Sequence, residues 1–275
     1  MKRPLTVGSG IDSRRMAGWT SVFAGYRHAV NEARIDRWLA QFRKQEQDLA
    51  ARILDSVDFV TQEQIAAAYR SLLAALPGWN PHETLRRGKW RFVAFSISAG
   101  QSGDTMLHRF RLANDLGSRE YGALFIHKSE LLTEGLGADD VVVFVDDFAG
   151  TGNQICDAWK ENIQELLPGN PKAYLLLVSA TSWAKAKVES ETPLIVNPYI
   201  SLGPEDNVFS DDCAHFSSQE KVILLRYCKK ANRVWPKGFG QCGLLVVLAH
   251  NCPNDSIPIL HAHNRRWEGL FRRHD

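Results

Sequence analysis

Two adjacent carboxylates, Asp146 and Asp147, follow a run of apolar residues from Val141 to Val145. A short loop rich in glycine and threonine comes next, and a helical pattern begins where the loop ends. An unbroken β-branched run is typical of a strand buried on both faces of a parallel sheet, and ligands bind at the carboxyl ends of such strands. The loop brings backbone N–H groups to a helix start, which suits a phosphate. Acids that bind hydroxyl groups beside a phosphate loop indicate a ribose 5-phosphate site.

This stretch resembles the 5-phosphoribosyl diphosphate (PRPP) motif of type I phosphoribosyltransferases, in which two acids precede a Thr-Gly pair. The pair here is Thr151 and Gly152, and Gln154 stands where a closing threonine is usual. The resemblance implies that Asp146 and Asp147 hold the ribose as catalytic residues, while the loop holds the 5-phosphate. The residues predicted to bind the phosphate are Gly150, Thr151, Gly152, Asn153 and Gln154.

The alternative is that the two acids have no ligand and simply face solvent at the end of a strand. Neighbouring side chains on a strand point in opposite directions, so one of Asp146 and Asp147 can meet the ribose hydroxyls while the other holds a loop or a Mg²⁺-bound water. Mg²⁺ is therefore the predicted cofactor. The nine histidines suggest no metal triad, and no metal site built from side chains alone is predicted. The sequence also lacks a Gly-x-x-x-x-Gly-Lys loop, which disfavours a nucleoside triphosphatase.

The elements that must position the acids alternate between strands and helices. The predicted strands are 91–97, 123–126, 141–145, 173–178 and 194–196, and helices are predicted at 105–114 and 154–167. Such alternation argues for a parallel sheet with right-handed crossovers. The predicted fold class is α/β, with a type I phosphoribosyltransferase-like core, an N-terminal helical appendage and a C-terminal hood.

A second turn-rich loop follows the first predicted strand and resembles the diphosphate loop of phosphoribosyltransferases in composition and position. Its glycines allow unusual backbone angles, and its last residues offer N–H donors at a helix start. The loop has no lysine or arginine, so Lys128, Arg109 or Arg111 must supply positive charge. An ordinary strand-to-helix turn is the alternative. The predicted binding residues of this loop are Ser98, Gly100, Gln101, Ser102 and Gly103.

A methyltransferase is the rival interpretation. The segment from Asp146 to Gly152 also resembles the Asp-Pro-Phe-x-Gly-x-Gly loop of S-adenosylmethionine-dependent DNA methyltransferases, and 197–199, Asn-Pro-Tyr, resembles their catalytic motif. Asp147 replaces the first proline of the loop, and the catalytic motif lacks its second proline. Methyltransferases usually carry the cofactor loop after the first sheet strand. Two strands are predicted before the acids here, so the order favours a phosphoribosyltransferase.

The flanking segments predict three parts: a tail and helical appendage at 1–88, the α/β core at 89–212, and a hood and tail at 213–275. In the first part, the spacing of Ile35, Trp38 and their apolar neighbours predicts a helix. Thr61 with Gln64 then forms a capping box for another helix, and in the last part Ser217 or Ser218 caps a helix that ends near Lys230.

The C-terminal segment combines cations with an interleaved aromatic, a composition that could hold a polyanion and stack a base. A solvated basic terminus is the alternative, because the net charge of the chain is only +2 and shows no bulk attraction to nucleic acid. The residues concerned are His261, His263, Arg265, Arg266, Trp267, Arg272 and Arg273.

Composition predicts a globular cytoplasmic protein. Of the 275 residues 44% are hydrophobic, and no run approaches the length of a membrane span or of a signal core. The five cysteines show no CxxC spacing, which indicates reduced thiols rather than disulfides or zinc.

The whole chain resembles a divergent family of phosphoribosyltransferase-like proteins found in bacterial conflict and anti-phage gene neighbourhoods. The resemblance implies a toxic effector restrained by partners, such as a retron reverse transcriptase with its nucleic acid, or a helix-turn-helix protein. It does not give the acceptor, for which a nucleotide and a nucleic acid both stay open, and a non-catalytic nucleotide-sensing module is a further alternative. The segments that carry the resemblance are 37–42, 59–61, 100–103, 111–114, 144–152, 238–241 and 253–258.

Overall fold

The computed structural model describes residues 11–95 and 102–273. The chain divides into two compact units. The terminal unit comprises Met1–Gln62 and Pro204–Asp275, and the sheet unit comprises Glu63–Gly203. This division differs from the predicted boundaries at 88 and 212, because the segments from both ends of the chain share one hydrophobic core.

A parallel four-stranded sheet forms the centre of the sheet unit, in the order β2-β3-β4-β5. Its α/β character confirms the predicted fold class. The apolar run from Val142 to Val145 has no exposed surface, as a central parallel strand requires. The elements of this unit are α4 (Gln62–Ala74), β2 (Trp90–Ala94), α5 (Ser102–Ala113), β3 (Val141–Ala149), α6 (Asn153–Ala158), β4 (Lys172–Thr181), α7 (Ser182–Glu191) and β5 (Ile195–Leu202).

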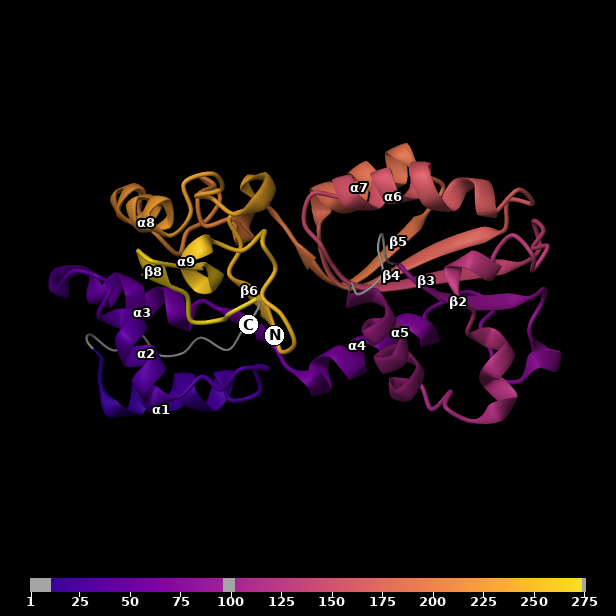
Figure 1. The fold of residues 1–275 in the computed structure, drawn as a ribbon, viewed down its shortest axis with the longest axis horizontal. Helices are drawn as coiled ribbons and strands as arrows, with labels where there is room; N and C mark the ends of the chain where they lie inside the picture. The colour runs from indigo at the N-terminus through magenta and orange to yellow at the C-terminus, as the bar shows by residue number, and fades with distance from the viewer. Residues whose placement is uncertain (1–10, 96–101, 274–275) are drawn as a thin grey trace. The chain divides into compact units, whose positions relative to one another are not determined.

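Helices cover both faces of this sheet. Helices α4 and α5 lie on one face and α6 and α7 on the other (Figure 1). On the first face Tyr69 of α4 packs edge-on against Phe110 of α5, with ring centroids 5.7 Å apart. On the second face Phe144 of β3 packs against Trp159, which follows α6, at 6.2 Å. Aromatic side chains therefore pack on both faces of the sheet.

The prediction of a strand at 123–126 is wrong. Residues Arg119–Leu124 form a 3₁₀ helix, and only Phe125 makes a parallel bridge, to Phe92 of β2. The bridge lies on the side of β2 away from β3, because Phe92 also pairs with Val143. The chain thus moves outward from β2 to Phe125 and then returns across β2 to β3. This reversal makes the space between β2 and β3 a topological switch point, where ligands bind in open α/β sheets.

Three strands extend further than predicted, and one of them is β4, which runs from Lys172 to Thr181 instead of 173–178. Strand β3 continues through Ala149, because Phe148 pairs with Ser179 and Ala149 with Ala180 of β4. The predicted strand 194–196 is the beginning of β5, which runs to Leu202. The two acids and the Asn-Pro pair, which follow the predicted strands in the sequence, therefore lie inside β3 and β5.

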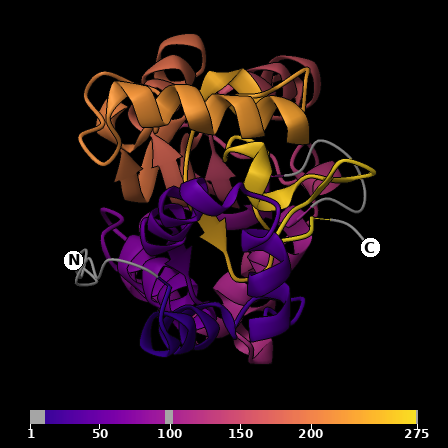
Figure 2. The ribbon, with the colours of Figure 1, turned by 90° about the vertical axis from the view of Figure 1, so that its left-hand side faces the viewer.

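The terminal unit is built from segments far apart in the sequence. Its indigo N-terminal helices and its yellow C-terminal segment belong to one buried cluster (Figures 1 and 2). The two segments also meet in a short parallel pair, β1 with β6, in which Phe59 pairs with Val247. The elements of this unit are α1 (Ser13–Phe23), α2 (Glu32–Leu39), α3 (Gln47–Asp55), β1 (Asp58–Val60), α8 (Ser218–Ala231), β6 (Val246–Leu248), α9 (Pro258–His261), β7 (His263–Asn264) and β8 (Trp267–Glu268).

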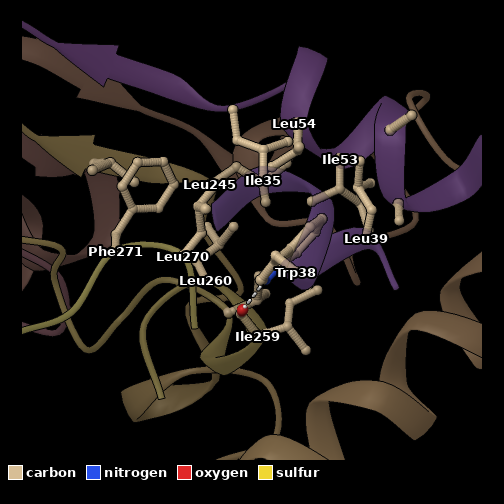
Figure 3. Close-up of a cluster of buried hydrophobic side chains, with 14 of the residues drawn as sticks. Ile35, Trp38, Leu39, Ile53, Leu54, Leu245, Ile259, Leu260, Leu270 and Phe271 are labelled. Carbon is tan, nitrogen blue, oxygen red and sulfur yellow. Dashed lines mark hydrogen bonds between the residues drawn. The ribbon is translucent and has the colours of Figure 1, made fainter. Parts of the chain in front are cut away.

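Trp38 of α2 lies at the centre of this core (Figure 3). Its side chain is 1% exposed, and its indole N–H donates to the backbone oxygen of Ile259 over 2.8 Å. The indole N–H of Trp267 donates to the same oxygen over 2.9 Å. Two tryptophans from opposite ends of the chain therefore hold one carbonyl group, and the backbone of α9 is fixed by them.

Helix α8 confirms the predicted helix start at Ser217 or Ser218, and its first turn forms a capping box that the sequence analysis did not predict. Ser217 is the N-cap residue, its hydroxyl accepts the N–H of Glu220, and the Glu220 carboxylate accepts the N–H of Ser217. Reciprocal capping of this kind satisfies two backbone donors at the helix start. All five cysteines are buried free thiols. Within residues 11–95 and 102–273, no helix combines the length and the apolar character needed to cross a membrane.

Candidate functional site

The two acids lie in the carboxyl-terminal part of β3, beside the switch point. Asp147 is 8% exposed and Asp146 is half-buried. Because side chains alternate along a strand, Asp146 shares a face with Phe144 on the α6 side, and Asp147 shares a face with Val145 on the α5 side. One oxygen of Asp146 accepts the backbone N–H of Asp147 over 2.9 Å. The pair thus places one carboxylate on each side of the strand.

Tyr69 is a site residue that the sequence did not reveal. Its hydroxyl donates to the backbone oxygen of Asp146 over 3.1 Å, and the side chain has no exposed surface. Burial raises the pKa of Tyr69 well above its ordinary value, and the negative charges of Asp147 and Asp146 raise it further. The hydroxyl therefore stays protonated and keeps donating. In the sequence, Tyr69 falls at an apolar position of an amphipathic helix, so nothing distinguished it from a core aromatic.

The loop after β3 is fastened to the start of α7. The hydroxyl of Thr181 donates to the backbone oxygen of Gly150 over 2.6 Å. The Thr181 hydroxyl oxygen also accepts the N–H of Ala184 over 3.0 Å, because Thr181 is the N-cap residue of α7. A single buried hydroxyl therefore joins the loop to the next helix of the sheet unit. Thr151 contributes within the loop itself, since its hydroxyl accepts the N–H of Asn153 over 3.3 Å.

Gly152 is required by the backbone at the end of this loop. Its φ angle is +78°, which is left-handed and favours glycine. A Cβ atom there would also lie 3.0 Å from the backbone oxygen of Ala184 and 3.2 Å from a methyl group of Val188. With Gly152 as the N-cap residue of α6, the N–H groups of Asn153 and Gln154 fall in the first turn, and both of these side chains are exposed. The first turn of a helix suits an anion.

The predicted diphosphate loop is described only at its end. Ser102 and Gly103 are the first residues of α5, in agreement with a helix start after the loop. Three of its predicted binding residues, Ser98, Gly100 and Gln101, lie outside the described residues, so their role stays a prediction. The last described residue before them, Phe95, still belongs to the sheet, because its N–H donates to the oxygen of Val145 over 3.0 Å.

The cations proposed for the diphosphate differ in their surroundings. Lys128 begins a 3₁₀ helix after the Phe125 bridge, which is parallel to β2 and therefore leads toward the carboxyl end of the sheet. Arg109 of α5 acts on the Tyr69 hydroxyl through its positive charge and lowers the pKa of that group. Arg111 donates to the backbone oxygens of Leu116 and Gly117 and lies over the ring of Phe125. The guanidinium of Arg111 is therefore engaged with the backbone of the segment that directly follows α5.

Asp146 and Asp147 are two carboxylates, too few to enclose a metal ion, but their oxygen atoms are of the kind that Mg²⁺ prefers. Carboxylate oxygens are hard ligands, and Mg²⁺ commonly takes one or two of them together with substrate phosphates and water. In the part of the chain that the structure describes, no group of three or more His, Cys, Asp or Glu side chains forms a metal cage. Asp146 and Asp147 are thus the residues that would hold or orient a hydrated ion in this site.

A family model named PRTase-CE matches residues 35–273 of the chain. No curated protein matches the chain at a significant level. The match includes both acids, the loop after them and the terminal segments, and it therefore spans most of both units. The chain belongs to the PRTase-CE family of phosphoribosyltransferase-like proteins.

Proposed function

We propose that the sheet unit binds PRPP, or a related ribose-phosphate nucleotide, with Mg²⁺ and transfers the ribosyl phosphate to an acceptor. The observation that carries this proposal is the acid pair of β3 followed by a loop that Thr181 fastens and Gly152 shapes. Membership of a phosphoribosyltransferase-like family supports it. The acceptor is a nucleotide or a nucleic acid in this proposal.

Each group of the site has a task in this reaction. The bond between ribose C1 and the diphosphate breaks, the diphosphate leaves with the electron pair, and the acceptor forms a new bond to C1 and gives up a proton. Asp146 and Asp147 would hold the ribose hydroxyls, and the backbone from Gly150 to Gln154 would hold the 5-phosphate. The Ser98–Gly103 loop and Lys128 would hold the diphosphate. Mg²⁺, when bound, supplies positive charge against the negative charge that develops on the leaving group.

Tyr69 would position the acids rather than contact the substrate. Its hydroxyl holds the Asp146 carbonyl over 3.1 Å, and its helix packs on α5 through Phe110. The strand end is thereby fixed before a ligand arrives. Pre-organisation of this kind lowers the conformational entropy that binding would otherwise lose.

The methyltransferase alternative finds less support. Asn197 and Pro198 pair with Leu176 and Leu177 inside the sheet and do not lie in a loop after β5. Calorimetry on the intact chain separates the two functions. We expect PRPP with Mg²⁺ to bind and S-adenosylmethionine not to bind. The opposite pattern would favour a methyltransferase. Binding of PRPP without release of diphosphate in the presence of nucleotides or nucleic acid would favour a non-catalytic nucleotide sensor.

We further propose that the protein is a cytoplasmic effector of a bacterial anti-phage defence system, restrained by partner proteins. The resemblance to proteins of bacterial conflict systems supports this role, and a retron reverse transcriptase with its nucleic acid or a helix-turn-helix protein is the kind of partner it suggests. Expression of the intact gene alone should slow bacterial growth, because the restraint would be missing. The Asp146→Asn, Asp147→Asn variant, produced at the same level, should not slow it. Equal growth inhibition by both proteins would show that the site is not the cause.

A further inference from the structure

A hollow of about 430 Å³ lies in the terminal unit, where the end of α8 meets the β7–β8 hairpin. Lys230 is in the last turn of α8 and Arg233 follows that helix, while His263 and Arg266 come from the hairpin. All four side chains are exposed. Among the described residues, no aspartate or glutamate lines the hollow. Its lining therefore carries positive charge alone.

The cations of the hollow are not neutralised by the protein. Lys230, Arg233 and Arg266 make no ion pair with any residue in 11–95 or 102–273. Other arginines of the same unit do: Arg226 of α8 pairs with Glu46, and Arg272 pairs with Glu268. The Lys230 ammonium instead lies 5.5 Å from the centroid of the Trp267 ring, a contact that leaves its charge uncompensated.

Two asparagines fix the backbone that carries these cations. Asn264 donates from its amide nitrogen to the oxygen of Ala231 over 2.8 Å, and its amide oxygen accepts the N–H of Arg266 over 2.9 Å. It thereby joins the hairpin to the end of α8. The amide oxygen of Asn232 accepts the N–H groups of Val234 and Trp235 over 2.9 and 3.0 Å, which holds the turn that contains Arg233.

Base stacking is not part of this site. The sequence predicted that Trp267 could stack a base, and this prediction is wrong, because its ring is 1% exposed and its N–H is bonded to Ile259. In the described part of the chain, no Trp, Tyr or Phe lines the hollow. A ligand that enters is therefore recognised by its negative charge and not by the faces of its bases. Cations in a concave surface favour phosphate groups in this way.

We propose that this hollow is a phosphate-binding site, which takes the phosphate groups of a nucleic-acid strand or of a free nucleotide without reading the base. The proposal concerns the terminal unit and does not depend on the PRPP site of the sheet unit. Arg233 and Arg266 supply the charge-assisted hydrogen bonds, and Lys230 adds a third positive charge.

Fluorescence anisotropy with a labelled oligothymidylate tests the proposal on the intact chain, and calorimetry with AMP tests the second source of phosphate. We expect the oligothymidylate to bind at low salt and its affinity to fall steeply between about 50 and 200 mM salt. The Arg233→Ala, Arg266→Ala variant should bind roughly tenfold more weakly or worse and show a shallower salt dependence. Binding of AMP with similar affinity would identify a free nucleotide as the ligand, and binding of the oligothymidylate alone would identify a strand.

The matched control removes two other exposed arginines of the same unit, in the Arg14→Ala, Arg37→Ala variant, and should bind like the unchanged protein. The Asp146→Asn, Asp147→Asn variant should also keep this binding, which separates the hollow from the PRPP site. Absence of binding for both probes at low salt would overturn the proposal. So would full binding by the Arg233, Arg266 variant, or an equal loss in the arginine control.

Discussion

The Asp146→Asn, Asp147→Asn variant is expected to lose PRPP binding by more than about a hundredfold, since each hydrogen bond to a charged group contributes roughly 1.5–3 kcal/mol. Asparagine keeps the size of aspartate but removes its charge and one acceptor. The variant can no longer hold the ribose hydroxyls and a hydrated Mg²⁺ ion together. Calorimetry with PRPP and Mg²⁺ measures the loss, and thermal unfolding shows that the variant is folded.

A control with the same change in charge makes this result specific. Asp115 and Asp139 are exposed acids of the sheet unit and lie outside the acid pair. The Asp115→Asn, Asp139→Asn variant should bind PRPP like the unchanged protein. If both variants bind PRPP equally well, the acids of β3 do not hold the ribose and the proposed function fails.

The Trp38→Ala variant is expected to destabilise the terminal unit by about 3–5 kcal/mol, the usual cost of truncating a buried tryptophan. The ring is 1% exposed and packs against Phe42 and Trp267 at centroid distances of 4.9 and 6.4 Å. Its removal leaves a cavity between segments from both ends of the chain. Denaturant unfolding, followed by tryptophan fluorescence and by circular dichroism, measures the change in the free energy of unfolding.

Two companion variants separate the cavity from other effects. Trp38→Phe keeps most of the volume, and the Ile259 oxygen keeps its bond from Trp267, so its cost should be much smaller than that of Trp38→Ala. Trp235→Ala removes a tryptophan that is 44% exposed in the same unit and should change stability little. If Trp38→Ala proves no more destabilising than Trp235→Ala, the core does not depend on the Trp38 ring.

Local patterns predicted the parts of this fold that local physics determines. The run at 141–145 is a central strand because β-branched residues buried on both faces have few other stable arrangements. Ser217, one of the two predicted caps, begins a helix because the hydrogen bond from the Glu220 N–H to its hydroxyl forms within four residues. The acids were correctly placed near the end of that strand, but sequence alone did not show that pairing with β4 continues past them to Ala149.

The remaining features depend on contacts between distant residues. Phe125 pairs with Phe92 through a single bridge, so a short apolar segment suggested a strand where a 3₁₀ helix forms. The role of Tyr69 depends on a carbonyl 77 residues away in the sequence. Trp267 was expected to be available to a base, yet the packing of Phe42 and Tyr227 around it buries its ring. None of these contacts leaves a periodic pattern in the chain.

The shared core of the terminal unit also affects how the protein is made. Trp38 and the Ile259 carbonyl are 221 residues apart, and the whole sheet unit lies between them in the sequence. At ribosomal rates of about 5–20 residues per second, the N-terminal helices would wait roughly 10–45 s for their partners to be synthesised. Their apolar faces stay uncovered during that time, while the sheet unit is already complete on the nascent chain. The core of the terminal unit can therefore be completed only after the whole sheet unit has been synthesised.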